Sequence, residues 1–139
     1  MFNPSREQVR IFFTTVLKKH HQNDILTPIE NQALNWVLKH PEYHEDLLNP
    51  DNQHKDYQVE NGQTNPFLHL SMHLAIQEQI NIDSPPGIKA IAQKLIQRYG
   101  EHEAHHKIME ALGLVIWEAQ RHGAPMNNER YLELLEKLV

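Results

Sequence analysis

The chain carries two pairs of metal-ligating side chains in which the two members lie four residues apart. The stretch FLHLSMHLAIQ contains His69 and His73, and the stretch HEAHHKIME contains His106 and Glu110. Side chains four residues apart lie on the same side of an α-helix, one turn apart. Two such side chains can chelate one ion, and a second pair on a facing helix can complete the coordination sphere. The spacing therefore predicts a metal site between two helices.

The surroundings of the two pairs differ. A histidine on an apolar face is costly to bury unless it has a partner. The second pair, His106 and Glu110, belongs to a line of polar side chains that begins at His102. This line lies beside the apolar face of the helix, and His105 lies on the apolar face itself. The line can therefore equally face solvent. On a helical wheel, His69 and His73 lie inside an apolar half that also contains Leu70, Met72, Leu74, Ile76 and Ile80.

Depth along the helices supports a shared site. If residues 84–100 form a return helix, the helices that carry the two pairs run parallel and begin at the same end of a bundle. At about 1.5 Å per residue, the first pair lies roughly 5 Å and 11 Å from the start of its helix, and the second pair lies at similar depths. We therefore expect His69, His73, His106 and Glu110 as ligands, with His102 or His44 as supplementary ones.

The types of ligand narrow the choice of ion. Imidazole nitrogen and carboxylate oxygen suit zinc, iron, manganese or nickel. The chain has no cysteine, which excludes disulfides, thiolate zinc sites, iron-sulfur clusters and cysteine nucleophiles. His44 belongs to a further four-apart pair in HPEYH, but Pro41 interrupts the helix between His40 and His44, so these two need not share a face.

Two metal-free interpretations stay open. In the first, His69 and His73 are neutral core histidines that donate to carbonyl groups, and the line that contains His106 is a solvated flank. In the second, a metal-free enzyme uses His73 or His106 as a general base that Glu110 orients. No nucleotide-binding loop and no serine-nucleophile motif occurs in the sequence, so phosphoryl and acyl transfer are disfavoured. Whether the protein is an enzyme stays undecided. Trp36 and Trp117 are interpreted as core residues rather than as groups that stack on a cofactor.

Helix start and stop signals divide the chain into helices, and no segment shows the alternation of a strand. The sequence predicts an all-α, single-domain bundle of five to six helices over residues 1–139, with a long polar loop at about 49–64. A short helical turn is expected at 41–48. The main helices are expected from Ser5 to about His20, from Thr27 to His40, over 66–82, from Ser84 to Gly100, over 101–122 and from Asn127 or Asn128 onward.

Composition limits the partners. The 139 residues carry a formal net charge of -5, so a phosphate backbone or an anionic membrane surface is expected to be repelled. We therefore expect neither nucleic acid nor membrane as a partner, and we leave a small-molecule ligand and a homo-oligomer open. No signal peptide or membrane span is recognisable, which favours a cytoplasmic location.

Several motifs carry a resemblance to a known family. NPFLHLSMHLAIQEQ, SPPGI, HEAHHKIME and IWEAQRHG, with the opening MFNPSREQVR and HPEYH, resemble a small bacterial family catalogued as domain of unknown function 1841. The resemblance covers nearly the whole chain and implies a bacterial cytosolic protein, but it implies no activity. It places six residues on the motif positions of the family: His69, His73, Glu78, His102, His106 and Glu110.

A looser similarity concerns architecture alone. Hemerythrin and DinB-like helical bundles also place such pairs on separate helices around a metal. The order of the motifs and the loop lengths differ here, so no ligand set carries over. The leading hypothesis is a cytosolic metal-binding helical bundle, with a transition metal between the helices at 66–82 and 101–122. The alternative is a metal-free structural or interaction module with core and pH-responsive histidines.

Overall fold

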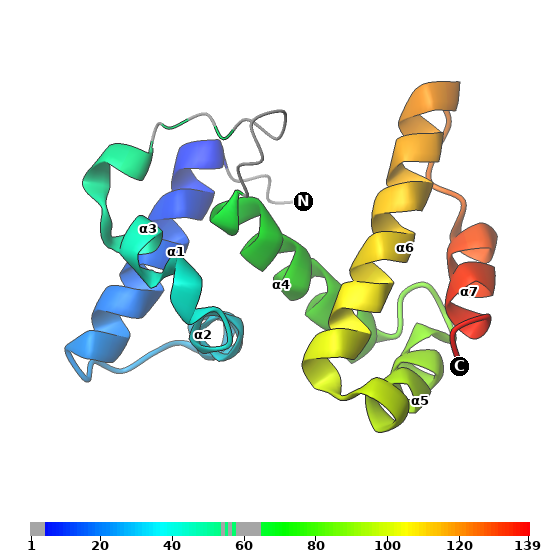
Figure 1. Ribbon diagram of the computed structural model, residues 1–139, viewed down its shortest axis with the longest axis horizontal. Coiled ribbons are helices and arrows are strands. Elements are labelled where there is room, and N and C mark those ends of the chain that lie inside the picture. Colours follow the sequence, from blue (N-terminus) through cyan, green and yellow to red (C-terminus); the bar gives the residue numbers. More distant parts are fainter. Residues whose placement is uncertain (1–4, 54, 56, 58–64) are drawn as a thin grey trace. The chain divides into compact units, whose positions relative to one another are not determined.

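The computed structural model describes residues 5–53, 55, 57 and 65–139 (Figure 1). These residues form seven α-helices and two short 3-10 helices, and no strand occurs among them. The predicted all-α class is confirmed. The predicted count of five to six helices is one too low, because the short turn expected at 41–48 forms the 3-10 helix η1 (Pro41–Tyr43) and then the helix α3 (His44–Leu48).

The chain divides into two compact units, residues 1–74 and 75–139. The boundary falls inside helix α4 (Pro66–Ile82), so the first half of α4 belongs to the first unit and the second half belongs to the second unit. The single domain over residues 1–139 stays a prediction. Among the described residues, no helix has both the length and the apolar character that crossing a membrane requires.

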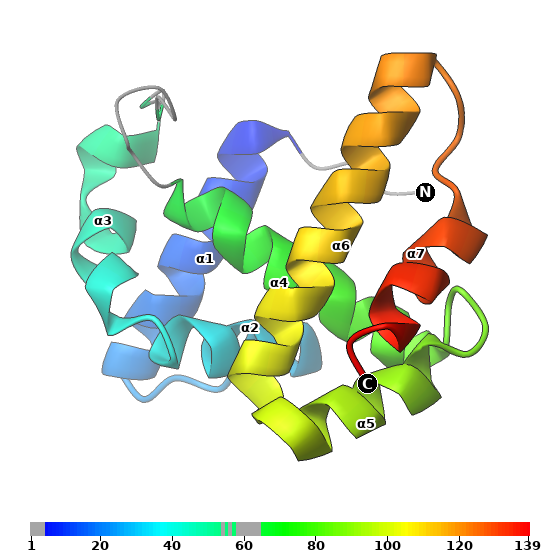
Figure 2. The same ribbon diagram turned by 45° about the vertical axis from the view of Figure 1, so that its right-hand side comes forward.

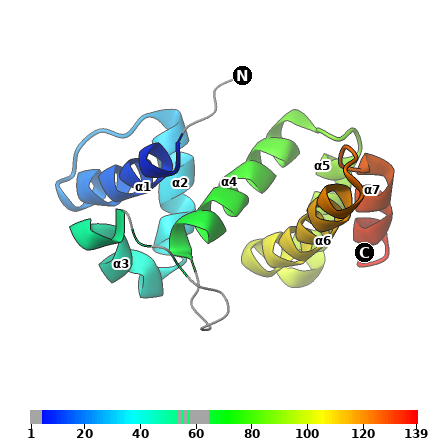
Figure 3. The same cartoon turned by 90° about the horizontal axis from the view of Figure 1, so that it is seen from above.

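Helices α1 (Arg6–His21) and α2 (Pro28–Leu38) lie against each other in the first unit, as Figure 3 shows. Each begins with a capping box, in which the hydroxyl of the first residue accepts from the backbone N–H three residues later, and the side chain of that later residue accepts from the backbone N–H of the first. Ser5 and Gln8 form the first box, and Thr27 and Glu30 form the second. The two helix starts are therefore fixed by local sequence.

The core of the first unit draws on all four of its α-helices. Thr14 of α1 also donates a hydrogen bond of 2.7 Å to the carbonyl oxygen of Leu47, which ties α3 to α1. The prediction that Trp36 is a core residue is confirmed, since its side chain is fully buried. The buried apolar members are Phe13, Val16, Leu17, Ala33, Trp36, Val37, Leu47, Phe67 and Leu70.

The second unit packs α5 (Ile88–Tyr99) and α7 (Asn128–Glu136) against α6 (Glu101–His122), and Figure 2 shows these three helices. Glu118 of α6 and Arg130 of α7 form an ion pair at 2.6 Å. The predicted range 101–122 is confirmed for α6, which ends before Gly123 because this residue adopts a φ of 62°, a value that glycine accepts without a steric cost. The core includes Ile76, Ile80, Ile88, Leu95, Ile108, Leu112, Val115, Tyr131 and Leu135.

Three expectations need correction or restriction. The helix predicted from Ser84 begins only at Ile88, because the Asp83 carboxylate accepts hydrogen bonds from the N–H groups of Gly87 and Lys89 and a turn precedes the helix. Trp117 is 53% exposed and is not a core residue. Of the loop predicted at 49–64, the structure shows Pro50–Gln53 as the 3-10 helix η2, and residues 54, 56 and 58–64 lie outside the described part.

Candidate metal centre

Three histidines of the first unit converge on one point. The Nε2 atom of His69 lies 3.1 Å from the Nε2 atom of His40 and 3.1 Å from the Nε2 atom of His73. One ring nitrogen from each of the three residues lies within 4.8 Å of the others. His40 and His73 are buried, and His69 is half-buried. The cluster therefore brings three imidazole nitrogens together in an arrangement that could hold a metal ion.

His69 and His73 reach this point because of their spacing on α4. They are one helical turn apart, so their rings project from the same side of the helix. Their ring centroids are 4.8 Å apart at an interplanar angle of 74°. The prediction that both side chains lie on the buried side of this helix is therefore confirmed in the first unit.

His40 reaches the cluster because α2 ends just before it. The backbone N–H of His40 bonds to the carbonyl of Val37 and not to that of Trp36, which would continue the α-helix. The carbonyl of Trp36 is thus one of the terminal carbonyls that a helix leaves without an internal partner. The Nδ1 atom of His40 lies 2.7 Å from this oxygen.

The contact with Trp36 fixes which nitrogen of the His40 ring carries a proton. A carbonyl oxygen can only accept, so Nδ1 of His40 carries the proton and donates it. In the neutral ring, the Nε2 atom then presents its lone pair towards His69. A histidine that ligates a metal almost always donates its other N–H in this way, to a carboxylate, a backbone carbonyl or water.

Aromatic rings hold the cluster from two sides. The indole of Trp36 stacks on the ring of His73, with centroids 4.3 Å apart and an interplanar angle of 8°. The phenol of Tyr43 stacks on the ring of His40 at 5.1 Å and 2°. The ammonium of Lys39 lies 4.5 Å from the Trp36 ring centroid. These contacts restrict the rotation of two of the three imidazoles.

Burial also affects the phenol beside the cluster. Removal from water raises the pKa of Tyr43 above its ordinary value, and the nearby charge of Glu42 adds to the increase. Tyr43 therefore stays protonated at neutral pH and can serve as a neutral wall of the site.

The distances fit common coordination angles. Two nitrogens that are each about 2.1 Å from an ion and 3.1 Å from one another subtend an angle of about 95° at the ion. This angle lies between the octahedral and the tetrahedral values, and it applies both to the His40 and His69 pair and to the His69 and His73 pair. The three rings therefore need little movement to ligate one ion.

His44 also bonds to the end of α2, and its role as a supplementary ligand stays a prediction. Its Nε2 atom is 2.8 Å from the carbonyl oxygen of Val37, so this nitrogen donates to a second terminal carbonyl of α2. Both histidines of HPEYH therefore bond to terminal carbonyl groups of α2. Only His40 also turns its second nitrogen towards His69.

The remaining predicted ligands belong to α6 in the second unit. The rings of His102 and His106 lie 4.4 Å apart at an interplanar angle of 60°, as their four-residue spacing predicts. Glu110 is exposed, and Glu78 of α4 is also exposed. The role of His102, His106 and Glu110 as ligands stays a prediction.

The sequence prediction missed His40. It placed His44 among the supplementary ligands and treated HPEYH as a pair broken by proline. The proline was the available signal, because a residue before proline is pushed out of helical geometry. His40 has φ -126° and ψ 63°, and this bend coincides with the change of hydrogen-bond partner at the end of α2.

Comparison with known proteins gives a family and nothing further. A family model described as Domain of unknown function (DUF1841) matches residues 5–137. No curated protein and no solved structure matches the chain. Since the match extends over nearly every residue, including His40, His69 and His73, the chain belongs to the DUF1841 family.

Proposed function

We propose that this protein binds a divalent transition metal through His40, His69 and His73. The observation that carries the proposal is that the Nε2 atom of His69 lies 3.1 Å from the Nε2 atoms of both His40 and His73, while the Nδ1 atom of His40 already bonds to a backbone carbonyl. Zinc, iron, manganese and nickel all accept such nitrogen ligands.

Proton counting favours an ion over simple packing. Each contact between two Nε2 atoms needs one donor and one acceptor, and His69 takes part in both contacts with a single Nε2 atom. One proton on this atom can form only one linear hydrogen bond, whereas an ion accepts all three lone pairs at once. The metal-free alternative, in which the three histidines only pack, leaves one of the two contacts poorly satisfied.

The proposed role of helix α6 in metal binding is based on its sequence alone. His102, His106 and Glu110 form a line of ligating side chains at four-residue spacing. We propose that His106 and Glu110 contribute to metal binding, with His102 as a supplementary ligand, and we test them separately from the cluster. Failure of the α6 variants to change metal affinity would leave the three-histidine site intact.

The test is the metal content and metal affinity of protein purified without a histidine tag. We expect about one equivalent of a transition metal after reconstitution, because three converging imidazoles form one site. The His69→Ala variant removes the central ligand and should retain less than about a tenth of an equivalent under the same conditions. His21→Ala is the matched control, since His21 lies exposed at the end of α1 and its loss should not change the metal content.

Thermal unfolding gives an independent measurement. A ligand that binds only the folded protein stabilises it by about 2.7 kcal/mol at a concentration of 100 times its Kd. We expect zinc, iron, manganese or nickel to raise the Tm of the wild type and of His21→Ala, but not that of His69→Ala. Wild-type protein that takes up no metal and shows no shift with any of these ions would overturn the proposal and favour the packing alternative.

The reaction that follows from a bound metal depends on the ion. Three protein ligands leave coordination positions for water or a substrate. A zinc-bound water of lowered pKa serves hydrolysis, and iron gives access to oxygen or redox chemistry. We therefore propose metal binding as the function, and the identity of the ion determines which reaction to assay.

A further inference from the structure

Helix α6 exposes two large apolar side chains in its second half. Trp117 is 53% exposed, and Leu114 is 39% exposed. They are three residues apart, so they are neighbours on the helix surface. Ile108 and Leu112 lie on the opposite side of the helix and belong to the core of the second unit. Since tryptophan is enriched in protein interfaces, the exposed pair marks a candidate contact surface.

A charged residue lies at each end of this pair. Glu110 precedes Leu114 by four residues, and its charge is negative. Arg121 follows Trp117 by four residues, and its guanidinium carbon lies 5.1 Å from the ring centroid of Trp117. At about 100° per residue, the four positions fall within an arc of about 60°, and we call them the α6 stripe. Both charged side chains are exposed, and neither forms an ion pair with another described residue.

The α6 stripe is complementary to a second copy of itself. Glu110 and Arg121 lie at equal distances from the centre of the stripe, as do Leu114 and Trp117. When two copies of the helix run antiparallel about a two-fold axis, Glu110 of each copy therefore lies opposite Arg121 of the other. Leu114 likewise lies opposite Trp117. A parallel pairing would place like charges opposite each other, so the charges select the antiparallel one.

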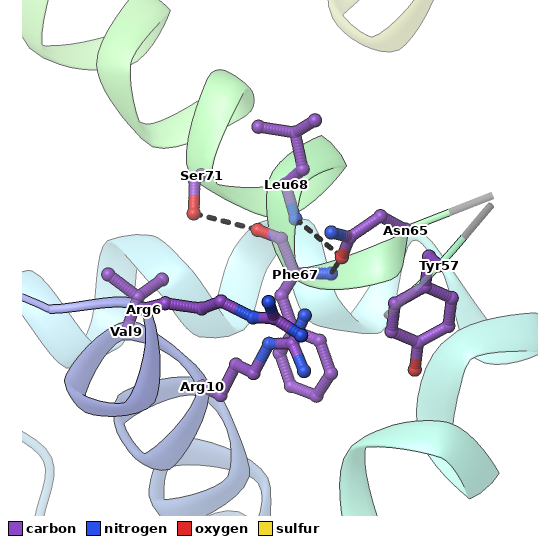
Figure 4. A pocket seen from close by; sticks show the side chains of 8 residues that line it. All are labelled: Arg6, Val9, Arg10, Tyr57, Asn65, Phe67, Leu68 and Ser71. Atoms are coloured by element: carbon purple, nitrogen blue, oxygen red, sulfur yellow. Dashed lines mark hydrogen bonds between the residues drawn. The ribbon is translucent and has the colours of Figure 1, made fainter. Parts of the chain in front are cut away.

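An exposed apolar side chain in the first unit offers a different kind of surface. Leu68 of α4 is 58% exposed. It lines a pocket of about 330 Å³ together with Arg6 and Arg10 of α1, as Figure 4 shows. Such a surface is concave, whereas a helix packs against its own copy through a ridge of side chains on its outer side. The α6 stripe has the second form.

We propose that two copies of this chain form an antiparallel dimer through the α6 stripe. Trp117 of each copy packs on Leu114 of the other, and two ion pairs between Glu110 and Arg121 border this apolar centre. One stripe of four side chains buries less than the roughly 1,200 Å² of a stable interface, so the dimer is weak and forms at high protein concentration. This inference goes beyond metal binding. Because Glu110 is also a proposed metal ligand, the measurements use chelator-treated protein.

Sedimentation velocity of the full chain between about 10 µM and 1 mM tests the proposal. We expect a reversible monomer–dimer equilibrium with a Kd of about 100 µM. Trp117→Ala removes an exposed ring and should weaken association by at least about tenfold. Ile116→Ala is the matched control, because Ile116 is 38% exposed on a different side of α6, and it should change the Kd by less than about twofold. A wild type that stays monomeric at about 1 mM, or an equal loss in both variants, would rule out the α6 stripe as a dimer surface.

Exchange of the two charges tests the antiparallel arrangement. Arg121→Glu places carboxylates opposite each other at both ends of the paired stripes and should weaken association by at least about tenfold. The double variant with Glu110→Arg and Arg121→Glu restores opposite charges, and its Kd should return to within about threefold of the wild-type value. Far-UV circular dichroism checks that each variant is folded. Wild-type association in Arg121→Glu, or a folded double variant that associates as weakly as the single one, would contradict the pairing of Glu110 with Arg121.

Discussion

The imidazole of His40 donates its Nδ1 proton to the carbonyl oxygen of Trp36 at a distance of 2.7 Å. The acceptor is the residue four positions earlier in the chain, at the point where α2 ends and leaves this carbonyl without a helical partner. The hydrogen bond orients the ring and directs its Nε2 lone pair towards His69. A local feature of the helix terminus therefore prepares one nitrogen of the proposed metal site.

The first prediction compares the two histidines of HPEYH. His40→Ala removes a proposed ligand and should weaken metal binding by at least about a hundredfold. Losing only a hydrogen-bond partner of a ligand weakens metal binding by up to about a hundredfold, and losing the ligand itself should have at least this effect. His44→Ala removes a donor to the Val37 carbonyl and should cost about 1 kcal/mol of unfolding free energy, but it should leave the metal affinity unchanged. Metal titration and denaturant unfolding of both variants measure the two effects.

His44→Ala serves here as the control for His40→Ala, because both histidines bond to terminal carbonyls of α2. The same loss of metal affinity in both variants would show that the end of α2, rather than the His40 nitrogen, is responsible. In that case His40 would have a structural role only.

The second prediction uses the stacking of Trp36 on His73. Because the two ring centroids are 4.3 Å apart, a paramagnetic ion bound to His73 lies close enough to the indole to quench its fluorescence. The chain has two tryptophans, and Trp117→Phe leaves Trp36 as the only one. We expect nickel to quench the emission of this variant with a saturable curve that ends at about one equivalent.

The matched control carries His69→Ala in addition to Trp117→Phe. It keeps the stack of Trp36 on His73 but lacks the central ligand, so nickel should no longer produce saturable quenching. Unchanged quenching in this double variant would show that nickel binds elsewhere on the chain.

The sequence predicted the helices well because their starts depend on neighbouring residues. At the helix starts expected at Ser5 and Thr27, Ser5 forms a capping box with Gln8 and Thr27 forms one with Glu30. Asn127 accepts a hydrogen bond from the N–H of Arg130 at the start of α7. Such interactions extend over three residues and need no information about packing. The prediction that a helix starts at Ser84 was wrong. The carboxylate of Asp83, and not the side chain of Ser84, accepts from the backbone N–H groups of Gly87 and Lys89.

The sequence predicted the candidate site only in part, for a physical reason. The pair on α4 follows from helical periodicity, which sequence spacing records directly. His40 lies outside a helix, and its ring position depends on which carbonyl its backbone N–H selects at the end of α2. The burial of Trp117 could not be predicted from the sequence for a similar reason. Its 53% exposure depends on which residues of the second unit pack beside it, and local spacing does not record this. The metal, the α6 ligands and the absence of nucleic acid and membrane partners stay predictions.

The third prediction concerns the pH dependence of stability. The carboxylate of Glu30 accepts a hydrogen bond from the backbone N–H of Thr27 and bonds of 3.1 and 2.9 Å from the ammonium of Lys19. The backbone bond first and the lysine second lower the pKa of Glu30 below its ordinary value. Its contribution to stability is therefore present above about pH 4.3, the ordinary value for glutamate, and is lost as the pH falls through the lower folded pKa.

Thermal unfolding of Glu30→Gln between pH 3 and pH 7 checks this dependence. The variant should have a lower Tm than the wild type at pH 7, and the two curves should converge as the pH falls below about 4. Glu78→Gln at an exposed position of α4 is the control, and its Tm should follow that of the wild type throughout. A difference for Glu30→Gln that stays constant over this range would exclude the ionised carboxylate as its cause.

The fourth prediction concerns the link between α7 and the second half of α4. The fully buried phenol of Tyr131 donates a hydrogen bond of 2.8 Å to the side-chain oxygen of Gln79. Tyr131→Phe keeps the ring but loses this bond, and it should cost about 1 kcal/mol of unfolding free energy in denaturant titration. Tyr131→Ala also loses the ring and should cost about 3 to 5 kcal/mol, because a cavity replaces it.

Measurements at alkaline pH separate the contribution of the Tyr131 hydroxyl to stability from the contribution of its ring. Burial raises the pKa of this phenol well above its usual range, so its contribution is complete below about pH 10 and is lost as the pH rises above that value, where the unfolded chain ionises. Wild-type stability should therefore fall above pH 10 more steeply than that of Tyr131→Phe. Parallel alkaline curves for Tyr131→Phe and the wild type would show that burial of this hydroxyl does not control stability in the second unit.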